Sequence, residues 1–150
     1  MHVDPRSTPS VVLRSPVSRP LGDPDPGETE RRGVRLTDAV DATTIGIVGW
    51  SAAGLDALAL AVANPHVPRL VLVAIACEPD EIEFDLARVR AKTLLLFGGQ
   101  DPATGSRHGR GWQKALPNAR LEMVPDGGHD LVGRMWARIL AHVAPRGAVR

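Results

Sequence analysis

Over its last two thirds, the sequence alternates between short apolar runs and amphipathic stretches. Short continuous apolar runs bounded by turn residues are typical of strands that are buried on both faces. Apolar residues repeating at i, i+3, i+4 and i+7 are typical of helices. The pattern predicts strands at 45–48, 70–75, 93–97 and 120–124, and helices at 52–64, 106–116 and 131–143. This alternation predicts an α/β fold with a parallel sheet of about four or five strands and flanking helices.

The first 33 residues follow neither pattern. Six of the 13 prolines fall there, among charged residues with little periodicity. We therefore expect 1–33 to be a Pro-rich, largely irregular N-terminal segment, 34–145 to be a single domain and 146–150 to be a flexible tail. The apolar patch 11–13 favours an edge strand, and residues 31–42 carry a weak helical pattern.

Composition narrows the class of protein. With 43% apolar residues, the 150-residue chain can build the core of one domain. Its 18 basic and 17 acidic residues give a net charge of +1, so nucleic acid and anionic membranes are not expected as partners. The single cysteine, Cys77, excludes an internal disulfide. No secretory signal pattern or membrane-length apolar run is visible, so we expect a cytoplasmic protein.

Three candidate catalytic side chains each follow a predicted strand. Ser51 follows the strand at 45–48, Asp101 follows the third strand and His129 follows the fourth. Singly, each has an ordinary explanation, since Ser caps helices, Asp precedes Pro in turns and His opens helices. Because the carboxyl ends of parallel strands meet at one edge of a sheet, we expect the three to lie together. Their types favour a nucleophile, Ser51, a base, His129, and a carboxylate, Asp101, that orients the base.

Two neighbours of Ser51 are further candidates. Ser51 stands in a sharp turn between strand and helix, so the backbone N–H of Ala52 is positioned to donate to an oxyanion. We assign Trp50 to the substrate-binding surface, and packing within the fold is the open alternative. Cys77 is expected to be a buried small residue. His108 and His129 lack a third ligand at metal spacing, and no phosphate-cradling pattern occurs, so we expect no metal and no cofactor.

Several stretches resemble one family. Leu-Leu-Leu-Phe-Gly-Gly-Gln-Asp-Pro at 94–102 and Gly-Gly-His-Asp at 127–130 are similar to the last two strands of esterases, lipases, haloperoxidase-like proteins and iminopeptidases of the α/β-hydrolase superfamily. The resemblance covers residues 44–143, and the order Ser, Asp, His is that of the family. It implies a serine hydrolase that cleaves a small carboxylic ester or related acyl substrate through a Ser-His-Asp triad and an acyl-enzyme.

The sequence also departs from the family. Ala53 stands where the elbow usually closes with Gly. No His-Gly or Gly-Gly-Gly loop precedes Ser51, and losing the oxyanion donor that this loop supplies costs about 100- to 1000-fold in kcat. The domain thus resembles a family member truncated at its N-terminal side. Only the acidic stretch 78–92 fills the place of a lid, so we expect an open site, or one completed by another chain. Residues 19–29 resemble an eroded Arg-Pro-Gly loop.

Two alternatives follow from these departures. Either the strand at 45–48 is an exposed edge that pairs with another chain, giving a homo-oligomer, or the patch at 11–13 covers it. The alternative to an active enzyme is a catalytically impaired or inactive α/β-hydrolase remnant that acts as a ligand-binding or protein-interaction domain.

Overall fold

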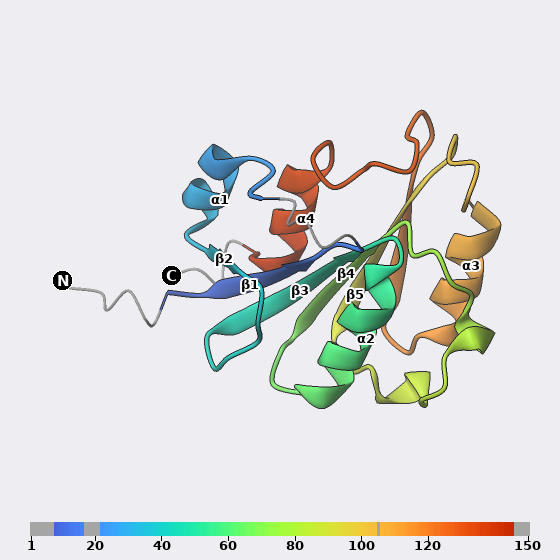
Figure 1. Ribbon diagram of the computed structural model, residues 1–150, viewed down its shortest axis with the longest axis horizontal. Coiled ribbons are helices and arrows are strands. Elements are labelled where there is room, and N and C mark those ends of the chain that lie inside the picture. Colours follow the sequence, from blue (N-terminus) through green and yellow to red (C-terminus); the bar gives the residue numbers. More distant parts are fainter. Residues whose placement is uncertain (1–7, 17–21, 105, 146–150) are drawn as a thin grey trace.

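A six-stranded parallel sheet with helices on both faces forms the centre of the computed structural model, which describes residues 8–16, 22–104 and 106–145 (Figure 1). The strand order is β2-β1-β3-β4-β5-β6. The strands are β1 Ser10–Arg14, β2 Arg35–Thr37, β3 Thr44–Trp50, β4 Arg69–Val73, β5 Lys92–Gly98 and β6 Ala119–Val124. The helices are α1 Pro26–Arg32, α2 Ala53–Ala63, α3 Ser106–Ala115 and α4 Trp136–Val143, with short 3-10 turns η2 Pro79–Glu81 and η3 Leu86–Arg88.

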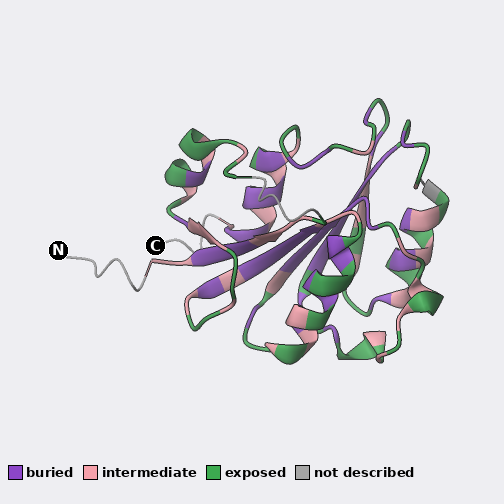
Figure 2. Cartoon of the chain, viewed as in Figure 1, coloured by how far each residue is buried: buried purple, intermediate pink, exposed green. Residues whose placement is uncertain are grey.

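Two apolar layers enclose the sheet. One lies between the sheet and α4, and the other lies between the sheet and α2 with α3. Because β3, β4 and β5 are covered on both sides, nearly all of their residues are buried, which explains their unbroken apolar runs (Figure 2). The expected α/β fold with a parallel sheet is therefore confirmed. Within the described ranges, none of the helices has the length and apolar character needed to cross a bilayer.

The sheet has six strands, and not the four or five expected, because two N-terminal segments join it. Strand β1 lies between β2 and β3, and its Val11 and Val12 are fully buried, so the prediction of an edge strand at 11–13 is wrong. The pairing of β1 with β3 also decides between the two alternatives for the strand at 45–48. It is an internal strand covered by β1, and the expected homo-oligomer stays a prediction.

Helix α1 is a second departure from the expected irregular N-terminus. Asp25 caps it by accepting from the N–H of Glu28, Pro26 occupies its first turn, and Gly33 ends it with a φ of 70°. The helical prediction for 31–42 is therefore wrong from 33 on, because α1 ends at Arg32 and β2 begins at Arg35. The expected loop at 19–29 is wrong for its last part, which is the start of α1. The expectations for 1–7, 17–21 and 146–150 lie outside the described residues.

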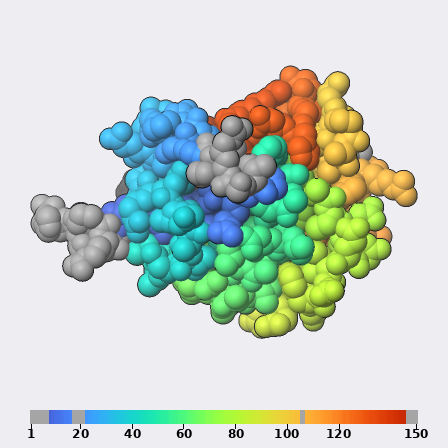
Figure 3. Space-filling view, viewed as in Figure 1, coloured from blue at the N-terminus to red at the C-terminus, as the bar shows by residue number. Residues whose placement is uncertain are grey.

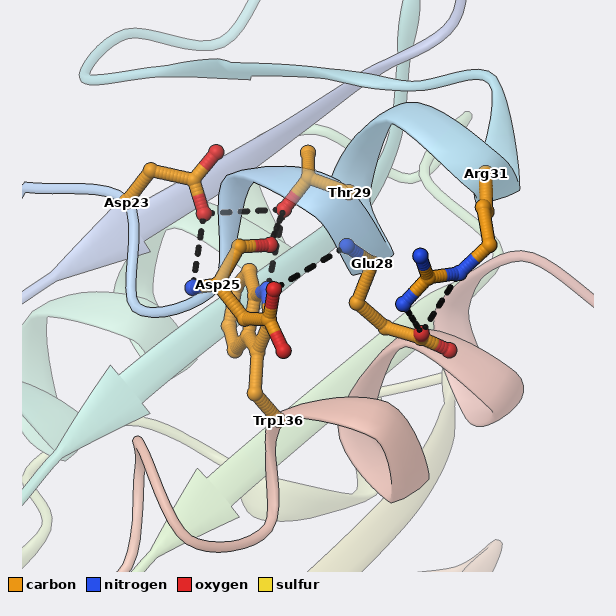
Figure 4. A network of polar contacts seen from close by, with 6 residues as sticks. All are labelled: Asp23, Asp25, Glu28, Thr29, Arg31 and Trp136. Atoms are coloured by element: carbon orange, nitrogen blue, oxygen red, sulfur yellow. Dashed lines mark hydrogen bonds and ion pairs between the residues drawn. The ribbon is translucent and has the colours of Figure 1, made fainter.

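A buried hydrogen bond ties α1 to α4. Trp136 Nε1 donates to Thr29 Oγ1 at 2.9 Å, and both residues are almost fully buried. The Thr29 hydroxyl also lies 2.9 Å from Asp23 Oδ1 and 3.0 Å from the Asp25 carbonyl oxygen (Figure 4). The space-filling view shows the α1 segment directly against the C-terminal segments (Figure 3). Helix α1 therefore belongs to the same packed layer as α4.

Helix α4 begins later than the sequence pattern predicts. Its first residue is Trp136, and not the residue 131 that apolar spacing predicts. Leu131 and Val132 are nevertheless buried in the layer under α4. The apolar spacing in this stretch therefore reflects burial and not helix formation. Residues 125–135 form a long connection between β6 and α4, and this connection carries His129.

Candidate active site

Ser51 lies at the carboxyl end of β3 in a strained turn. Its φ is 55°, a left-handed conformation that residues with a Cβ rarely adopt. Backbone hydrogen bonds hold this conformation. The Ser51 N–H donates to the Val73 carbonyl at 2.9 Å, and the Ser51 carbonyl accepts from the Gly54 N–H at 3.0 Å. The elbow predicted from the sequence is therefore present, with the serine directed out of the end of the sheet.

Close packing behind the elbow explains the glycines on either side of Ser51. A Cβ at Gly49 would lie 2.6 Å from the Ala57 Cβ, and a Cβ at Gly54 would lie 2.7 Å from Ile75 Cγ1. These distances are shorter than any ordinary carbon–carbon contact, so α2 can approach β3 and the segment after β4 only where no side chain intervenes. Ala53, where the family usually has Gly, is accommodated as a buried helical residue.

Asp101 lies in the turn that follows β5 and is almost fully buried. Its Oδ1 accepts from the Ala103 N–H at 2.8 Å, and its Oδ2 accepts from the Thr104 hydroxyl at 2.6 Å. Burial is the largest influence on this carboxyl group and acts to raise its pKa. Hydrogen bonds from Thr104, His129 and Ala103 outweigh burial, and the net pKa of Asp101 is lowered. The group is therefore a carboxylate at neutral pH.

His129 connects the other two residues. Its Nδ1 lies 2.7 Å from Asp101 Oδ2, and its Nε2 lies 2.8 Å from Ser51 Oγ. A proton on Nδ1 donates to the carboxylate, which leaves Nε2 free to accept the serine proton. The His129 side chain is 32% exposed, so solvent reaches this chain of hydrogen bonds. The structure thus brings together all three residues selected from the sequence.

Two pairs of glycines let the loops that carry Asp101 and His129 meet. A Cβ at Gly98 would lie within 2.3 Å of the carbonyl oxygens of Gly127 and Gly128. A Cβ at Gly99 would lie 2.7 Å from the Pro125 carbonyl oxygen. The two loops therefore touch through their backbones, which places the imidazole within reach of the carboxylate.

Ala52 lies where an oxyanion donor is expected. It is exposed and occupies the N-cap position of α2, with a φ of −62°. Among the described residues, its N–H donates to no backbone carbonyl. A free N–H at a helix N-terminus favours nearby negative charge. The oxyanion role of Ala52 stays a prediction.

The end of β1 borders the elbow. In the parallel register, Arg14 lies opposite Gly49, so the chain leaves β1 next to the turn at Ser51. The Arg14 guanidinium binds the carboxylate of Asp56 on the first turn of α2, and it also donates to the Asp38 carbonyl at 2.8 Å. Arg14 therefore links the end of β1 to α2, the helix that follows Ser51.

Trp50 contacts His129. Its indole Nε1 donates to the backbone carbonyl of His129 at 2.9 Å, and the two rings are 5.6 Å apart at an angle of 44°. The indole also packs against the buried layer under α4. Of the two roles that the sequence leaves open for Trp50, the packing contact is present, and the substrate contact stays a prediction.

The remaining candidates take no part in this arrangement. Cys77 lies four residues after the end of β4 and is half-buried. Burial raises the pKa of its thiol, so the thiolate form is disfavoured. Residues 78–92 contain η2 and η3 and form no helical lid. Within the described ranges, no three His, Cys, Asp or Glu side chains gather in a way that would hold a metal ion.

Two polar contacts at the site were not predicted from the sequence. The first is the Thr104 hydroxyl on Asp101, and the second is the Trp50 indole on the His129 backbone. The turn after Asp101 carries a signal for the first, because Asp and Thr side chains commonly bond to groups two or three residues away in turns. The second contact spans two distant segments and has no local signal.

Comparisons with known proteins agree with this architecture. No family model matches the chain. The Rattus norvegicus protein ABHD14B, whose name assigns it a protein-lysine deacylase activity, is 32% identical over 111 residues, which cover 73% of this chain and 50% of that protein. The chain therefore spans about half the length of this curated relative.

Solved structures resemble the chain over most of its length. A CIB-like hydrolase from Thermoplasma acidophilum has a TM-score of 0.71 at 18% identity, covering 91% of this chain and 86% of its own. Est1E from Butyrivibrio proteoclasticus has a TM-score of 0.69 at 15% identity, covering 91% and 87%. A monoacylglycerol lipase from Paleococcus ferrophilus has a TM-score of 0.67 at 13% identity, covering 91% and 95%. At these identities, the similarity concerns the fold.

Proposed function

The chain has the α/β-hydrolase fold, and on this premise we propose that it is a serine hydrolase that cleaves a small carboxylic ester or a related acyl substrate. One observation carries the proposal. Ser51 Oγ, the His129 imidazole and the Asp101 carboxylate form a continuous chain of hydrogen bonds of 2.8 and 2.7 Å at the carboxyl edge of the sheet. The hydrolase names of the structural neighbours give support at the level of the reaction class.

The proposed reaction has two stages. In the first, Ser51 Oγ attacks the substrate carbonyl carbon while His129 Nε2 takes the hydroxyl proton, and the Ala52 N–H donates to the oxygen that becomes negative. Asp101 stabilises the imidazolium. The intermediate then collapses, the ester C–O bond breaks, and His129 returns the proton to the leaving alcohol. In the second stage, water gives a proton to His129 Nε2 as it attacks the acyl carbon. The bond between that carbon and Ser51 Oγ then breaks, His129 returns the proton to Ser51 Oγ, and the carboxylic acid is released.

The exposure of the site supports a broad substrate class. Ala52 is exposed and a third of the His129 side chain reaches solvent, while residues 78–92 form no lid over them. Such a site can take an acyl group that is attached to a larger carrier. Because the name of ABHD14B concerns deacylation of protein lysine, an acylated lysine side chain is a second substrate class to test beside simple esters.

A burst experiment with p-nitrophenyl acetate tests the proposal. We expect the wild-type protein to release about one equivalent of p-nitrophenolate per chain in a fast phase, followed by slower turnover, because the acyl-enzyme accumulates. Ser51→Ala should abolish both phases. Cys77→Ser is the matched control, since it removes the only thiol and leaves the proposed nucleophile intact.

Two results would contradict the proposal. Hydrolysis that persists in Ser51→Ala would place the chemistry elsewhere in the chain. A folded wild-type protein that hydrolyses neither the ester nor an acetyl-lysine peptide would favour the alternative of an inactive domain that binds a ligand or another protein.

A further inference from the structure

We propose that Trp50 is a positioning residue for the base, because its indole N–H fixes the backbone at His129 and thereby holds the imidazole against Ser51. The inference rests on the proposed function and deepens it. It assigns to the residue before the nucleophile a role in placing a side chain that lies 79 residues further along the chain.

Adjacent residues of the elbow hold His129 at two points. Ser51 Oγ lies 2.8 Å from the imidazole Nε2, and Trp50 Nε1 lies 2.9 Å from the His129 carbonyl oxygen. The indole and imidazole rings also lie 5.6 Å apart. Because Trp50 is the last residue of β3 and Ser51 follows it, both contacts start from the end of one largely buried strand. The nucleophile and the base are therefore placed by the same short piece of backbone.

The loop around His129 has few other restraints. Two hydrogen bonds of 2.9 Å hold the start of the connection from β6 to α4. The Gly127 N–H donates to the Val124 carbonyl, and the Gly127 carbonyl accepts from the Gln100 N–H. In the described part of the chain, residues 128–130 make no backbone–backbone hydrogen bond. Nothing lies within 4 Å of the position where Gly128 would carry a Cβ. The indole contact is thus the hydrogen bond that restrains the main chain beside the imidazole.

A substrate-wall role for Trp50 makes a different prediction. The indole N–H is already used by the protein, so a substrate can meet only the surface of the ring. Replacing Trp50 by Phe keeps an apolar aromatic ring and removes the N–H donor. A positioning role predicts a lower rate for every substrate by the same factor, whereas a wall role predicts an altered preference among acyl chains. Misplacing a catalytic group by about 1 Å can cost on the order of 100-fold in rate.

Trp112→Phe is a matched control for Trp50→Phe. Trp112 Nε1 also donates to a backbone carbonyl, that of Cys77, at 2.9 Å, and the indole is fully buried between α3 and the sheet. Both variants lose one indole donor to one main-chain acceptor. A general loss of packing or stability therefore affects Trp112→Phe at least as strongly, while only Trp50→Phe changes a contact to His129.

The test combines a spectroscopic and a kinetic measurement. Imidazole ¹⁵N–¹H NMR reports the His129 tautomer without turnover. We expect one tautomer, protonated at Nδ1, in the wild type and in Trp112→Phe, and a mixture in Trp50→Phe. With p-nitrophenyl acetate and hexanoate, we expect kcat to fall at least about tenfold in Trp50→Phe, with KM changed less than about twofold and an unchanged ratio between the two esters.

Either of two results would overturn the inference: His129 signals in Trp50→Phe identical to those of the wild type, or an unchanged kcat with a shifted ratio between the esters. Failure of the proposed function is distinguishable from these. A wild-type protein without esterase activity would remove the proposed reaction, while the NMR comparison would still decide whether Trp50 orients His129.

Discussion

Replacing Ser51 by glycine should give a more stable protein than replacing it by alanine. Both variants remove the hydroxyl and its 2.8 Å contact with His129. They differ in the backbone, because alanine keeps a Cβ at a φ of 55° and glycine does not. The comparison therefore isolates the backbone strain at residue 51.

The expected difference follows from two opposing effects. A residue with a Cβ in the left-handed region costs about 1–2 kcal/mol, and glycine loses about 0.5–1 kcal/mol more conformational freedom on folding than alanine. The difference leaves Ser51→Gly more stable than Ser51→Ala by about 0.5–1 kcal/mol. In a chain of this size, each 1 kcal/mol shifts the melting temperature by roughly 2–4 °C. At Ala59, an exposed residue inside α2, the same change from Ala to Gly should instead destabilise by about 1 kcal/mol.

Urea unfolding followed by far-UV circular dichroism measures these differences on one scale. The opposite signs at positions 51 and 59 are the decisive result, since any general effect of glycine on the unfolded chain is common to both. The contrary result is a loss of stability from alanine to glycine at position 51 that equals the loss at position 59. Such a result would show that the backbone at Ser51 carries no strain.

Three further predictions concern the surroundings of the site. Gly49→Ala should lower the free energy of unfolding by about 1–3 kcal/mol in urea, because its Cβ would lie 2.6 Å from a side chain of α2. Thr104→Val should lower kcat/KM about tenfold and Thr104→Ser should restore it, because the hydroxyl supports the Asp101 carboxylate at 2.6 Å. Arg138 lowers the pKa of Glu122 below its ordinary 4.5. The ion pair therefore stabilises the fold fully above pH 4.5, and this stabilisation is lost as the pH falls through the lowered pKa of Glu122. The free energy of unfolding of Glu122→Gln should depend less on pH below 4.5 than that of the wild type.

The sequence was informative where local signals and tertiary structure agree. The apolar runs of β4 and β5 are unbroken because both faces of these strands are buried, and that burial is visible in the composition of a few consecutive residues. Ser51, Asp101 and His129 could be selected because each follows a strand, and the ends of parallel strands converge. Fold and candidate triad thus followed from short-range patterns and one topological rule.

Other elements depend on partners that are distant in the sequence. Strand β2 has three residues, too few for any alternation to be recognised, and its place is set by pairing with β1. Helix α1 carries an N-cap at Asp25 and a terminal Gly33, but the surrounding prolines outweighed these signals. Leu131 and Val132 continue the apolar spacing of α4 although they precede the helix, because burial alone produces such spacing.

The contact of Trp50 with His129 shows the same limit at the site. Nothing near residue 50 indicates that its indole N–H will meet a carbonyl in a loop near the other end of the chain. A tryptophan beside a nucleophile is compatible with substrate binding or with packing, and only the relative placement of two loops distinguishes the two roles.

Mass mapping of a fluorophosphonate adduct tests the central claim most directly, because the reagent reacts only with a serine that a neighbouring base activates. We expect one phosphonyl group per chain on the peptide that contains Ser51, with labelling lost in Ser51→Ala and strongly slowed in His129→Gln. A folded wild-type protein that takes up no phosphonate, or takes it up on another residue at an equal rate in Ser51→Ala, would show that Ser51 is not an activated nucleophile.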